Sequence, residues 1–264
     1  MRHASIVGRR RALTGRSGCA RAPHAAPVPS FLVAALTVLM TGSALAGEPQ
    51  LAAERQRFEA ADAVLNQLYA EAAREFPELL FEQLRLDQRR WLAQRDPYAE
   101  QVANLQGAAE AGLETDEPWF WLARTERTEG RAQVLRGWLA YAREGSPGVW
   151  EGVWVDGYGG RLLVAEGPAD RVVFALLVVR GPTFHLGEIA GVAERNVRTA
   201  RFVTEPLFGE GRTWLTFVRD GPWVRVVAEN AESFHGMRAY FDGLYVRVDD
   251  LTPEDRDALA AVLE

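Results

Sequence analysis

Residues 84–96 read LRLDQRRWLAQRD, and the order of charge and apolar residues in this stretch decides how the first half of the chain folds. Gln88, Trp91 and Arg95 recur at spacings of three and four, so on a helix they share one face with apolar residues. An arginine on such a face needs a partner, because an unpaired buried guanidinium costs several kcal/mol. The stretch therefore predicts an amphipathic helix that is held to a neighbouring helix by an ion pair.

The preceding segment offers the partner. Asp62 and Asn66 lie one helical turn apart among apolar residues in ADAVLNQLY. We predict that Arg95 reaches Asp62 or its neighbourhood while it stacks on Trp91 or Tyr69. The other arginines of the stretch are expected to be solvated: Arg85, Arg89 and Arg90.

The segment 48–145 predicts three helices. Apolar residues recur every three or four positions from Phe58 to Phe76, which is the period of an amphipathic helix. A second helix is predicted to begin at Pro77, and Pro97 should kink or interrupt it. A third should open at Thr115 or Asp116, with proline in its first turn, and end at residue 145.

After residue 146 the pattern changes to short β-rich runs separated by glycine-rich turns. The runs occupy residues 149–155, 162–166, 172–179, 200–205, 213–219, 223–229 and 244–248. About seven short strands at this spacing predict a small antiparallel barrel or sandwich. Thr252 and Asp255 form a capping-box pattern for a short last helix. The fold class is thus predicted to be α+β, with an antiparallel helical domain over 47–145 and a β domain with a C-terminal helix over 146–264.

The first 46 residues have the composition of a secretory signal. They contain six arginines and no acidic residue, then an apolar run over 31–40 that is too short to span a bilayer. Ala44 and Ala46 form an A-x-A pattern, so cleavage is predicted after Ala46 by the ordinary secretory route. The mature chain is expected to be periplasmic or secreted, with no stable membrane anchor.

Removal of these residues makes the chain strongly acidic. Residues 47–264 keep 24 arginines against 36 acidic residues, a net charge of −12. This balance argues against nucleic acid or an anionic membrane as partner and favours a cationic one. The alternative is that the acidity only keeps the protein soluble.

Few residues are suited to catalysis. The chain has no lysine, its one cysteine is Cys19 in the presequence, and past residue 47 it holds two serines and two histidines. Ser233 and His235 could form a nucleophile pair, but no third acidic partner or GxSxG turn accompanies them. We therefore expect no disulfide, no metal, no cofactor and no enzymatic activity.

Two other features have a functional and a simpler explanation. Acidic pairs such as Asp249 and Asp250 could serve a carboxylate-based hydrolase, which would need two convergent acids in a cleft, but such pairs are usually solvated. The eight tryptophans could line a sugar-binding groove, although core packing and contacts between the helices and the β domain are favoured.

Three ordered motifs in the helical half resemble a known family. DxxLNxxY, QRxWxxxRD and TxxRxxxL, spread over roughly residues 54–140, are similar to the N-terminal domain of the lysozyme inhibitor LprI family. The motif positions are Asp62, Leu65, Asn66, Tyr69, Gln88, Arg89, Trp91, Arg95, Asp96, Thr128, Arg131 and Leu135. The resemblance implies a helical fold, in which these residues are mainly structural, and an exported bacterial protein that binds and inhibits lysozyme, a cationic muramidase.

The chain departs from the family pattern in having no cysteines in this region, where Trp119, Phe120 and Trp121 are expected to brace the helices by packing instead. HGMRAYFDGLYVR at 235–247 and FHLGEIAGVA at 184–193 resemble segments of β domains that follow such helical domains. Arg180 and His185, in RGPTFHLGE, are the candidate residues for contact with a lysozyme.

The alternative function is a periplasmic binding module, without lysozyme inhibition, for a small ligand, a peptidoglycan fragment or another envelope protein. The interior of the β domain should separate the two, since a ligand carrier would have a continuous apolar cavity, whereas an inhibitor would have a filled barrel with protruding charged loops.

Overall fold

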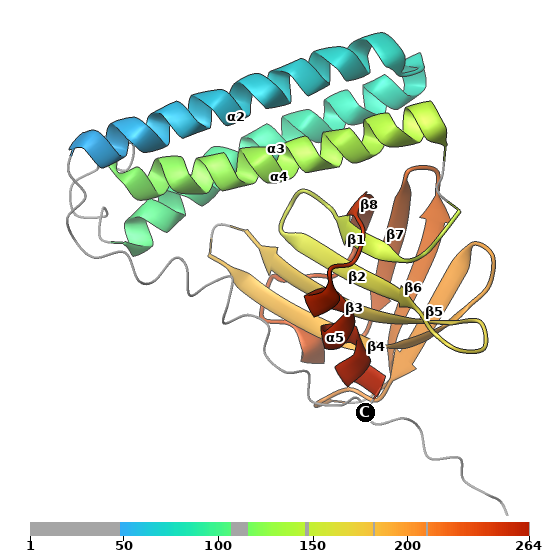
Figure 1. Ribbon diagram of the computed structural model, residues 1–264. Helices are drawn as coiled ribbons and strands as arrows, with labels where there is room; N and C mark the ends of the chain where they lie inside the picture. Colours follow the sequence, from blue (N-terminus) through green and yellow to red (C-terminus); the bar gives the residue numbers. More distant parts are fainter. Residues whose placement is uncertain (1–47, 107–115, 146–147, 182, 210, 264) are drawn as a thin grey trace, which may run out of the picture.

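A computed structural model describes residues 48–106, 116–145, 148–181, 183–209 and 211–263. Three long helices, α2 (Glu48–Glu75), α3 (Glu78–Leu105) and α4 (Pro118–Glu144), precede a closed barrel of eight antiparallel strands and the short helix α5 (Pro253–Ala260). Figure 1 shows the helical layer along one side of the barrel. The predicted α+β class is confirmed, while the predicted signal over 1–46 lies outside the described residues.

The helix boundaries follow from proline and glycine. Pro77 caps α3, and α4 begins at Pro118, two or three residues later than predicted. Gly145 ends α4 with φ 79°, and its amide donates to Tyr141 O at 2.8 Å. The predicted interruption at Pro97 is wrong, because α3 continues through this residue to Leu105. Among the described residues no helix is both long enough and apolar enough to cross a membrane.

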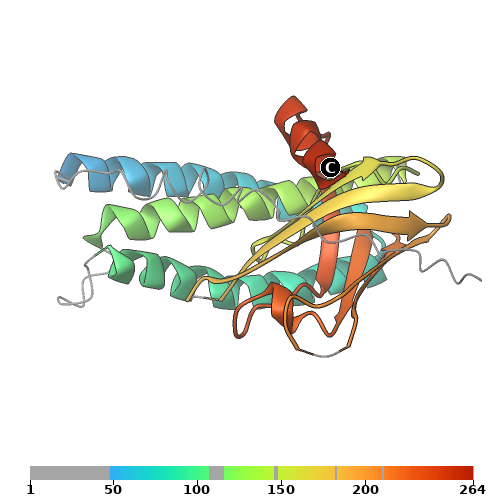
Figure 2. The ribbon, with the colours of Figure 1, turned by 90° about the horizontal axis from the view of Figure 1, so that it is seen from below.

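Helix α4 lies between α2 and α3 (Figure 2), and the three share a buried core that includes Leu65, Leu84, Trp91 and Leu135. Arg95 is buried, and its Nη1 donates to Asp62 Oδ1 at 3.3 Å while its Cζ lies 5.4 Å from the Trp91 ring centroid. Both parts of the prediction for Arg95 are confirmed. Of the arginines expected in solvent, Arg89 and Arg90 are exposed, whereas Arg85 is half-buried and pairs with Glu82 at 2.5 Å.

The barrel decides between the two predicted β architectures. Each strand pairs antiparallel with the next, and β8 pairs with β1. The strands are β1 (Gly152–Val155), β2 (Gly160–Glu166), β3 (Arg171–Arg180), β4 (His185–Arg195), β5 (Thr199–Thr204), β6 (Thr213–Asp220), β7 (Trp223–Glu229) and β8 (Gly243–Asp249).

Strand β4 was missing from the sequence prediction. Three of its inward positions hold small residues, Gly187, Gly191 and Ala193, beside the larger Ile189, and these small residues gave the segment the composition of a loop. The structure explains Gly191, because a Cβ there would collide with the Phe202 ring that fills this part of the barrel. The side chains of Trp154, Phe174, Phe217 and other buried residues pack the barrel interior in the described part of the chain.

The short helix α5 covers the outer face of β2 and β3, where Leu259 packs with Leu163 and Val173. Its predicted capping box is confirmed, with Asp255 N donating to Thr252 Oγ1 at 3.1 Å and Thr252 N donating to Asp255 Oδ2 at 3.0 Å.

The helical layer and the barrel share one apolar cluster, in which Trp138 of α4 packs on Trp223 of β7 and the helices' core extends to Val246 of β8. At Gly137 the backbones of α4 and β8 approach closely, since a Cβ there would lie 2.6 Å from Arg247 O. Around Trp138, Trp223 and Val246 the helices and the barrel are therefore in direct apolar contact.

Candidate binding groove between helices and barrel

Two adjoining pockets lie between the helical layer and the end of the barrel. We name the first the tryptophan pocket, about 510 Å³, which is lined by Trp138 and Trp223. We name the second the arginine pocket, about 450 Å³, which is lined by Arg95, Arg127, Arg180, Arg238 and His185. Both are also lined by Gln94, Arg180, Tyr158 and Tyr240, so the two pockets adjoin, and we call the pair the groove.

A buried polar network holds the walls of the groove together. Arg131 of α4 is fully buried, and it donates from Nε to Gln88 Oε1 and from Nη1 to Asp87 Oδ2, both at 2.7 Å. On the barrel side, the Tyr158 hydroxyl donates to Asp87 Oδ1 at 2.7 Å. Burial and the neighbouring Asp87 carboxylate both raise the pKa of Tyr158, so its hydroxyl stays a neutral donor. Side chains from α3, α4 and the β1–β2 turn thus meet at one carboxylate.

A second network closes the barrel end at the floor of the groove. Arg180, the last residue of β3, forms a buried salt bridge with Asp156 and donates to the Tyr245 hydroxyl at 3.1 Å and to Tyr240 O at 3.0 Å. Asp156 accepts in addition from the Tyr158 and Gly160 amides at 2.8 and 2.7 Å. Although burial opposes the charge, Asp156 holds the pKa of Arg180 above its ordinary value.

This position corrects the expectation for Arg180 as a residue of a contact loop. Arg180 is 2% exposed and its donors are bonded inside the protein, so its side chain could enter a partner's cleft only by breaking these bonds. His185 is the first residue of β4 and lies at the rim of the arginine pocket, where its Nε2 is 2.7 Å from Thr183 Oγ1.

The two pockets differ in their charge. The tryptophan pocket is mixed, since Asp87, Asp156 and Asp242 line it together with Arg90, Arg180 and Arg225. The indole nitrogens of Trp138 and Trp223 are buried there and have no acceptor in the described part of the chain. The arginine pocket has four arginines and no described acidic residue in its lining.

The motif residues of the helical half lie mainly in contacts between helices. Asp96 receives hydrogen bonds from Arg95 Nε at 2.8 Å and from Arg124 Nε at 2.9 Å. Asn66 donates to Asp62 at 2.9 Å, and Thr128 donates to the carbonyl oxygen of Arg124 at 2.8 Å. Four further motif residues are buried: Leu65, Trp91, Arg131 and Leu135. Tyr69 packs on Phe81. Of the twelve motif residues, Arg89 alone faces solvent without a partner in the described chain.

Sequence reasoning missed Arg124 and Arg127, which lie on α4 just before the TxxRxxxL motif. Arg124 lies 4.2 Å over the Phe58 ring and closes the Arg95–Asp96 cluster, and Arg127 lies 3.7 Å over the Tyr98 ring. One sequence signal could have found both, since Arg127 lies at i−4 and Arg124 at i−7 from Arg131, which places all three arginines on one side of the helix.

The residues considered for catalysis do not come together. Ser233 Oγ accepts from the Leu207 amide at 3.2 Å, and His235 Nδ1 lies 3.0 Å from Gly236 O. Asp250 pairs with Arg247. In the described ranges no group of three or more histidine, cysteine or acidic side chains is placed to hold a metal ion.

The chain matches no family model, and no curated protein or solved structure is significantly similar to it.

Proposed function

We propose that this chain is an exported binding protein without enzymatic activity, and that it holds its ligand in the groove between the helices and the barrel. The observation that carries the proposal is that both walls of the groove are fixed in place. Arg131, Asp87 and Tyr158 join them by hydrogen bonds, and Trp138 and Trp223 join them by packing. Preformed concave sites between structural units are where small ligands usually bind.

The alternative location, inside the barrel, is less well supported. The described barrel interior is packed by large side chains such as Phe174, Phe217 and Tyr245, and Arg180 with Asp156 closes the end that faces the helices. A carrier barrel would instead need a continuous apolar cavity. The filled interior therefore argues against a ligand inside the barrel and, by the criterion set from the sequence, favours the inhibitor on this point. Ser233 Oγ and His235 Nδ1 are each bonded to the backbone, which argues against the nucleophile pair considered from the sequence.

A groove-blocking variant tests the proposal. Gln94 is exposed and lines both pockets, so Gln94→Trp should fill the groove where the pockets join. Leu92→Trp is the matched control, because Leu92 is exposed on the same helix outside both linings. Residues 47–264 would be incubated with a soluble peptidoglycan digest and with a total envelope extract, and bound small molecules detected by native mass spectrometry.

We expect bound species on the parent protein and on the control, and a marked loss on Gln94→Trp. Equal retention by all three proteins would place binding outside the groove, and no retention by the parent from either pool would contradict a binding function.

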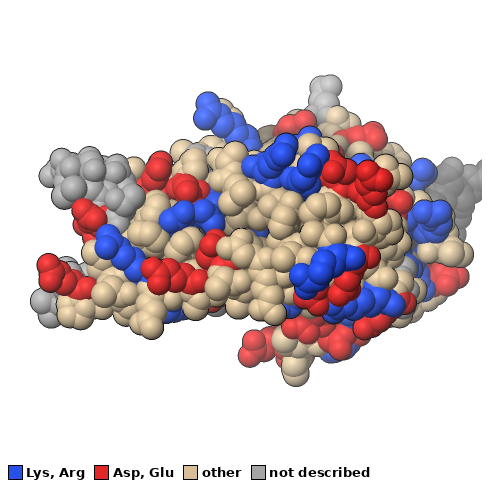
Figure 3. Space-filling model, turned by 90° about the horizontal axis from the view of Figure 1, so that it is seen from above, with Lys and Arg blue, Asp and Glu red and all other residues tan. Residues whose placement is uncertain are grey.

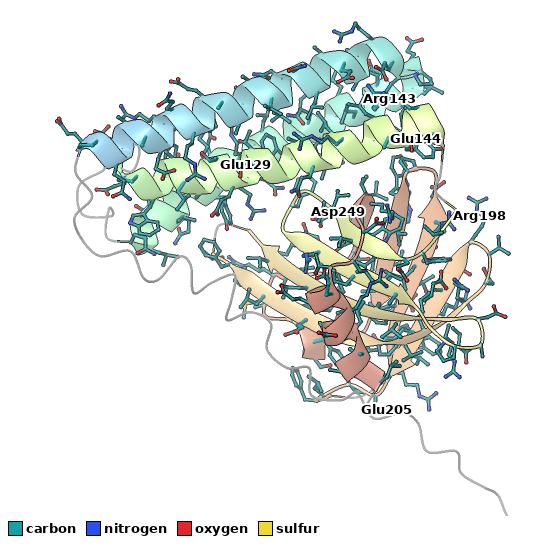
Figure 4. All side chains as sticks on the ribbon, in the orientation of Figure 1. Glu129, Arg143, Glu144, Arg198, Glu205 and Asp249 are labelled. Atoms are coloured by element: carbon teal, nitrogen blue, oxygen red, sulfur yellow. The ribbon has the colours of Figure 1, made fainter. Side chains whose placement is uncertain are left out.

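The second candidate is binding and inhibition of a cationic lysozyme, which the sequence resemblance and the net charge of −12 over residues 47–264 both favour. Exposed acids occur on both parts of the molecule, including Glu129 and Glu144 of α4 and Glu205 and Asp249 at the barrel (Figure 4). On the helical side they are mixed with arginines (Figure 3), and Arg143, for example, pairs with Glu71 and Glu75. Such a surface would steer a cationic partner by its net charge rather than by one acidic patch.

Purified residues 47–264 should then slow the lysis of cell walls by lysozyme, and the effect should fade as salt rises, because salt screens attraction between exposed charges. Micromolar protein without inhibition at low salt would refute this candidate.

A further inference from the structure

We propose that the arginine pocket binds the carboxylate or phosphate group of an acidic sugar, with Arg127 and Arg238 as the charges that recognise it. This inference rests on the proposed function and names the ligand class of the same groove.

The charge of the pocket is opposite to that of the protein. Acidic residues outnumber basic ones by 36 to 24 over residues 47–264, yet the lining of this pocket has four arginines, one histidine and no described acid. A concave, partly desolvated site with one sign of charge concentrates ligands of the other sign. The pocket is therefore suited to an anion although the molecule as a whole repels anions.

Two of the four arginines are already neutralised inside the protein. Arg180 forms its salt bridge with Asp156, and Arg95 pairs with Asp62 and Asp96. These side chains complete the pocket wall, but their charge is compensated.

Arg127 and Arg238 have no such partner. Neither forms a salt bridge with an acidic residue in the described part of the chain. They reach the pocket from two different parts of the fold, Arg127 from α4 and Arg238 from the segment between β7 and β8. An oxyanion between them would receive the forked hydrogen bonds that guanidinium groups form with carboxylates and phosphates.

Arg127 is held in position by contacts other than a salt bridge. Its Cζ lies 3.7 Å from the Tyr98 ring centroid, and its Nη1 lies 3.2 Å from the position that a Cβ of Gly159 would occupy. It is therefore placed between α3 and the β1–β2 turn. Burial raises the pKa of Tyr98, which keeps this phenol neutral, so Tyr98 does not become a counter-charge.

The backbone around the pocket is strained at two residues. Phe184 and Arg238 have φ values of 54° and 70°, in the left-handed region that non-glycine residues seldom adopt. Phe184 is held there by an edge contact with Tyr98 at 5.1 Å. Strain of this kind often occurs at ligand sites, and it also occurs outside this pocket at Ala169, Asp170 and Asn230.

The rest of the groove suits a sugar ring. Tyr158 and Tyr240 contribute aromatic rings to the lining, and Thr183 and His185 add polar groups at its rim. The volume of about 450 Å³, adjoining the tryptophan pocket, is in the range of small-molecule sites.

Three sugars that share one ring test the inference: neutral N-acetylglucosamine, N-acetylmuramic acid with its carboxylate, and N-acetylglucosamine 6-phosphate. Their binding to residues 47–264 would be measured by titration calorimetry at low and high salt. We expect one acidic sugar to bind at least about tenfold more tightly than the neutral sugar, since a tenfold ratio corresponds to one modest charge-assisted contact. The affinity for this acidic sugar should fall as the salt concentration rises. The tighter of the two identifies the group as carboxylate or phosphate.

Arg127→Gln and Arg238→Gln should each reduce that affinity by about tenfold. Arg89→Gln is the matched control, since Arg89 is exposed on α3 and lines neither pocket. Arg238 is exposed at the rim, so its variant keeps the test valid if Arg127→Gln lowers the melting temperature.

Absence of binding by both acidic sugars overturns the inference, as does equal binding of the neutral sugar or affinity that neither variant changes. If no acidic sugar binds but Gln94→Trp still abolishes retention of some other ligand, the proposed binding function stands and only the ligand class is wrong. If no ligand is retained in a groove-dependent way either, both the proposed function and the ligand class are contradicted.

Discussion

Replacement of Gly137 by alanine tests how closely the helical layer approaches the barrel. Gly137 lies in the middle of α4, where a Cβ would collide with the Val246 side chain and lie 2.6 Å from Arg247 O. Because the second obstacle is a backbone atom of β8, a rotamer change cannot remove it. The same helix contains Gly130, around which nothing lies within 4 Å of the Cβ position.

Helix propensity and packing predict opposite signs for these two glycines. Alanine is favoured over glycine in a helix interior by about 1 kcal/mol, so Gly130→Ala should raise the unfolding free energy by about that amount. At Gly137 the same gain is opposed by overpacking, which costs about 1–3 kcal/mol and should lie near the upper end against backbone. We therefore expect Gly137→Ala to destabilise the protein by about 1–2 kcal/mol.

Urea unfolding of both variants, monitored by circular dichroism, measures the two free energies against the parent. The difference between the variants should be about 2–3 kcal/mol, and it is independent of errors in the parent's absolute stability. If Gly137→Ala proves as stable as Gly130→Ala, α4 does not pack on β8 as described, and the argument for a preformed groove fails with it.

Three further changes have defined outcomes. Arg95→Ala should lower the unfolding free energy by about 2 kcal/mol, because Asp62 and Asp96 lose a charged donor but keep access to water. An unchanged melting temperature would mean that this ion pair does not stabilise the fold. Burial raises the pKa of Tyr158 and Tyr245 above the ordinary 10.0, so their contribution to stability is complete below that pH and is lost as pH rises through the folded pKa values. In an alkaline titration, tyrosinate absorbance from these residues should therefore appear together with unfolding. Ionisation of the two tyrosines before unfolding would contradict this. Although burial opposes it, hydrogen bonds from Thr252 lower the pKa of Asp255 below the ordinary 3.8, so the contribution of Asp255 to stability is present above that pH and is lost as pH falls through the folded pKa. Asp255→Asn should therefore lower the unfolding free energy by about 1 kcal/mol at neutral pH and by less in acid. A loss of stability that does not change with pH would mean that the carboxylate charge does not contribute.

The features that the sequence predicted correctly depend on local periodicity or on a chemical necessity. The three helices repeat their apolar residues over many turns, and the capping box at Thr252 involves residues only three apart. The Arg95–Asp62 pair is longer in range, but a buried guanidinium requires an acid, and the neighbouring helix offered Asp62 on its apolar face.

The features that it did not predict depend on contacts between distant segments. Strand β4 carries glycine where the interior is already filled by Phe202, so its composition reflects a neighbour rather than its own conformation. Tyr158 meets Asp87 across 71 positions, and nothing near either residue indicates the other. The arginine pocket likewise gathers side chains from α3, α4, β3 and the segment before β8, so it exists only after the barrel has closed against the helices.

The motif residues and the proposed binding residues are different sets, and this separation bears on function. The polar atoms of Arg95, Asp96 and Arg131 are largely bonded to other residues of the chain, so a partner could use them only by breaking contacts between the helices. The motifs thus report how the helical layer is held together, whereas Arg127 lies outside them and forms no salt bridge in the described part of the chain. If lysozyme is inhibited through the acidic surface, Arg127→Gln should leave that inhibition intact while it weakens binding of the acidic sugar. Loss of both activities in a variant with an unchanged melt would instead mean that the two ligands share the groove, and the separation argued from these residues would be wrong.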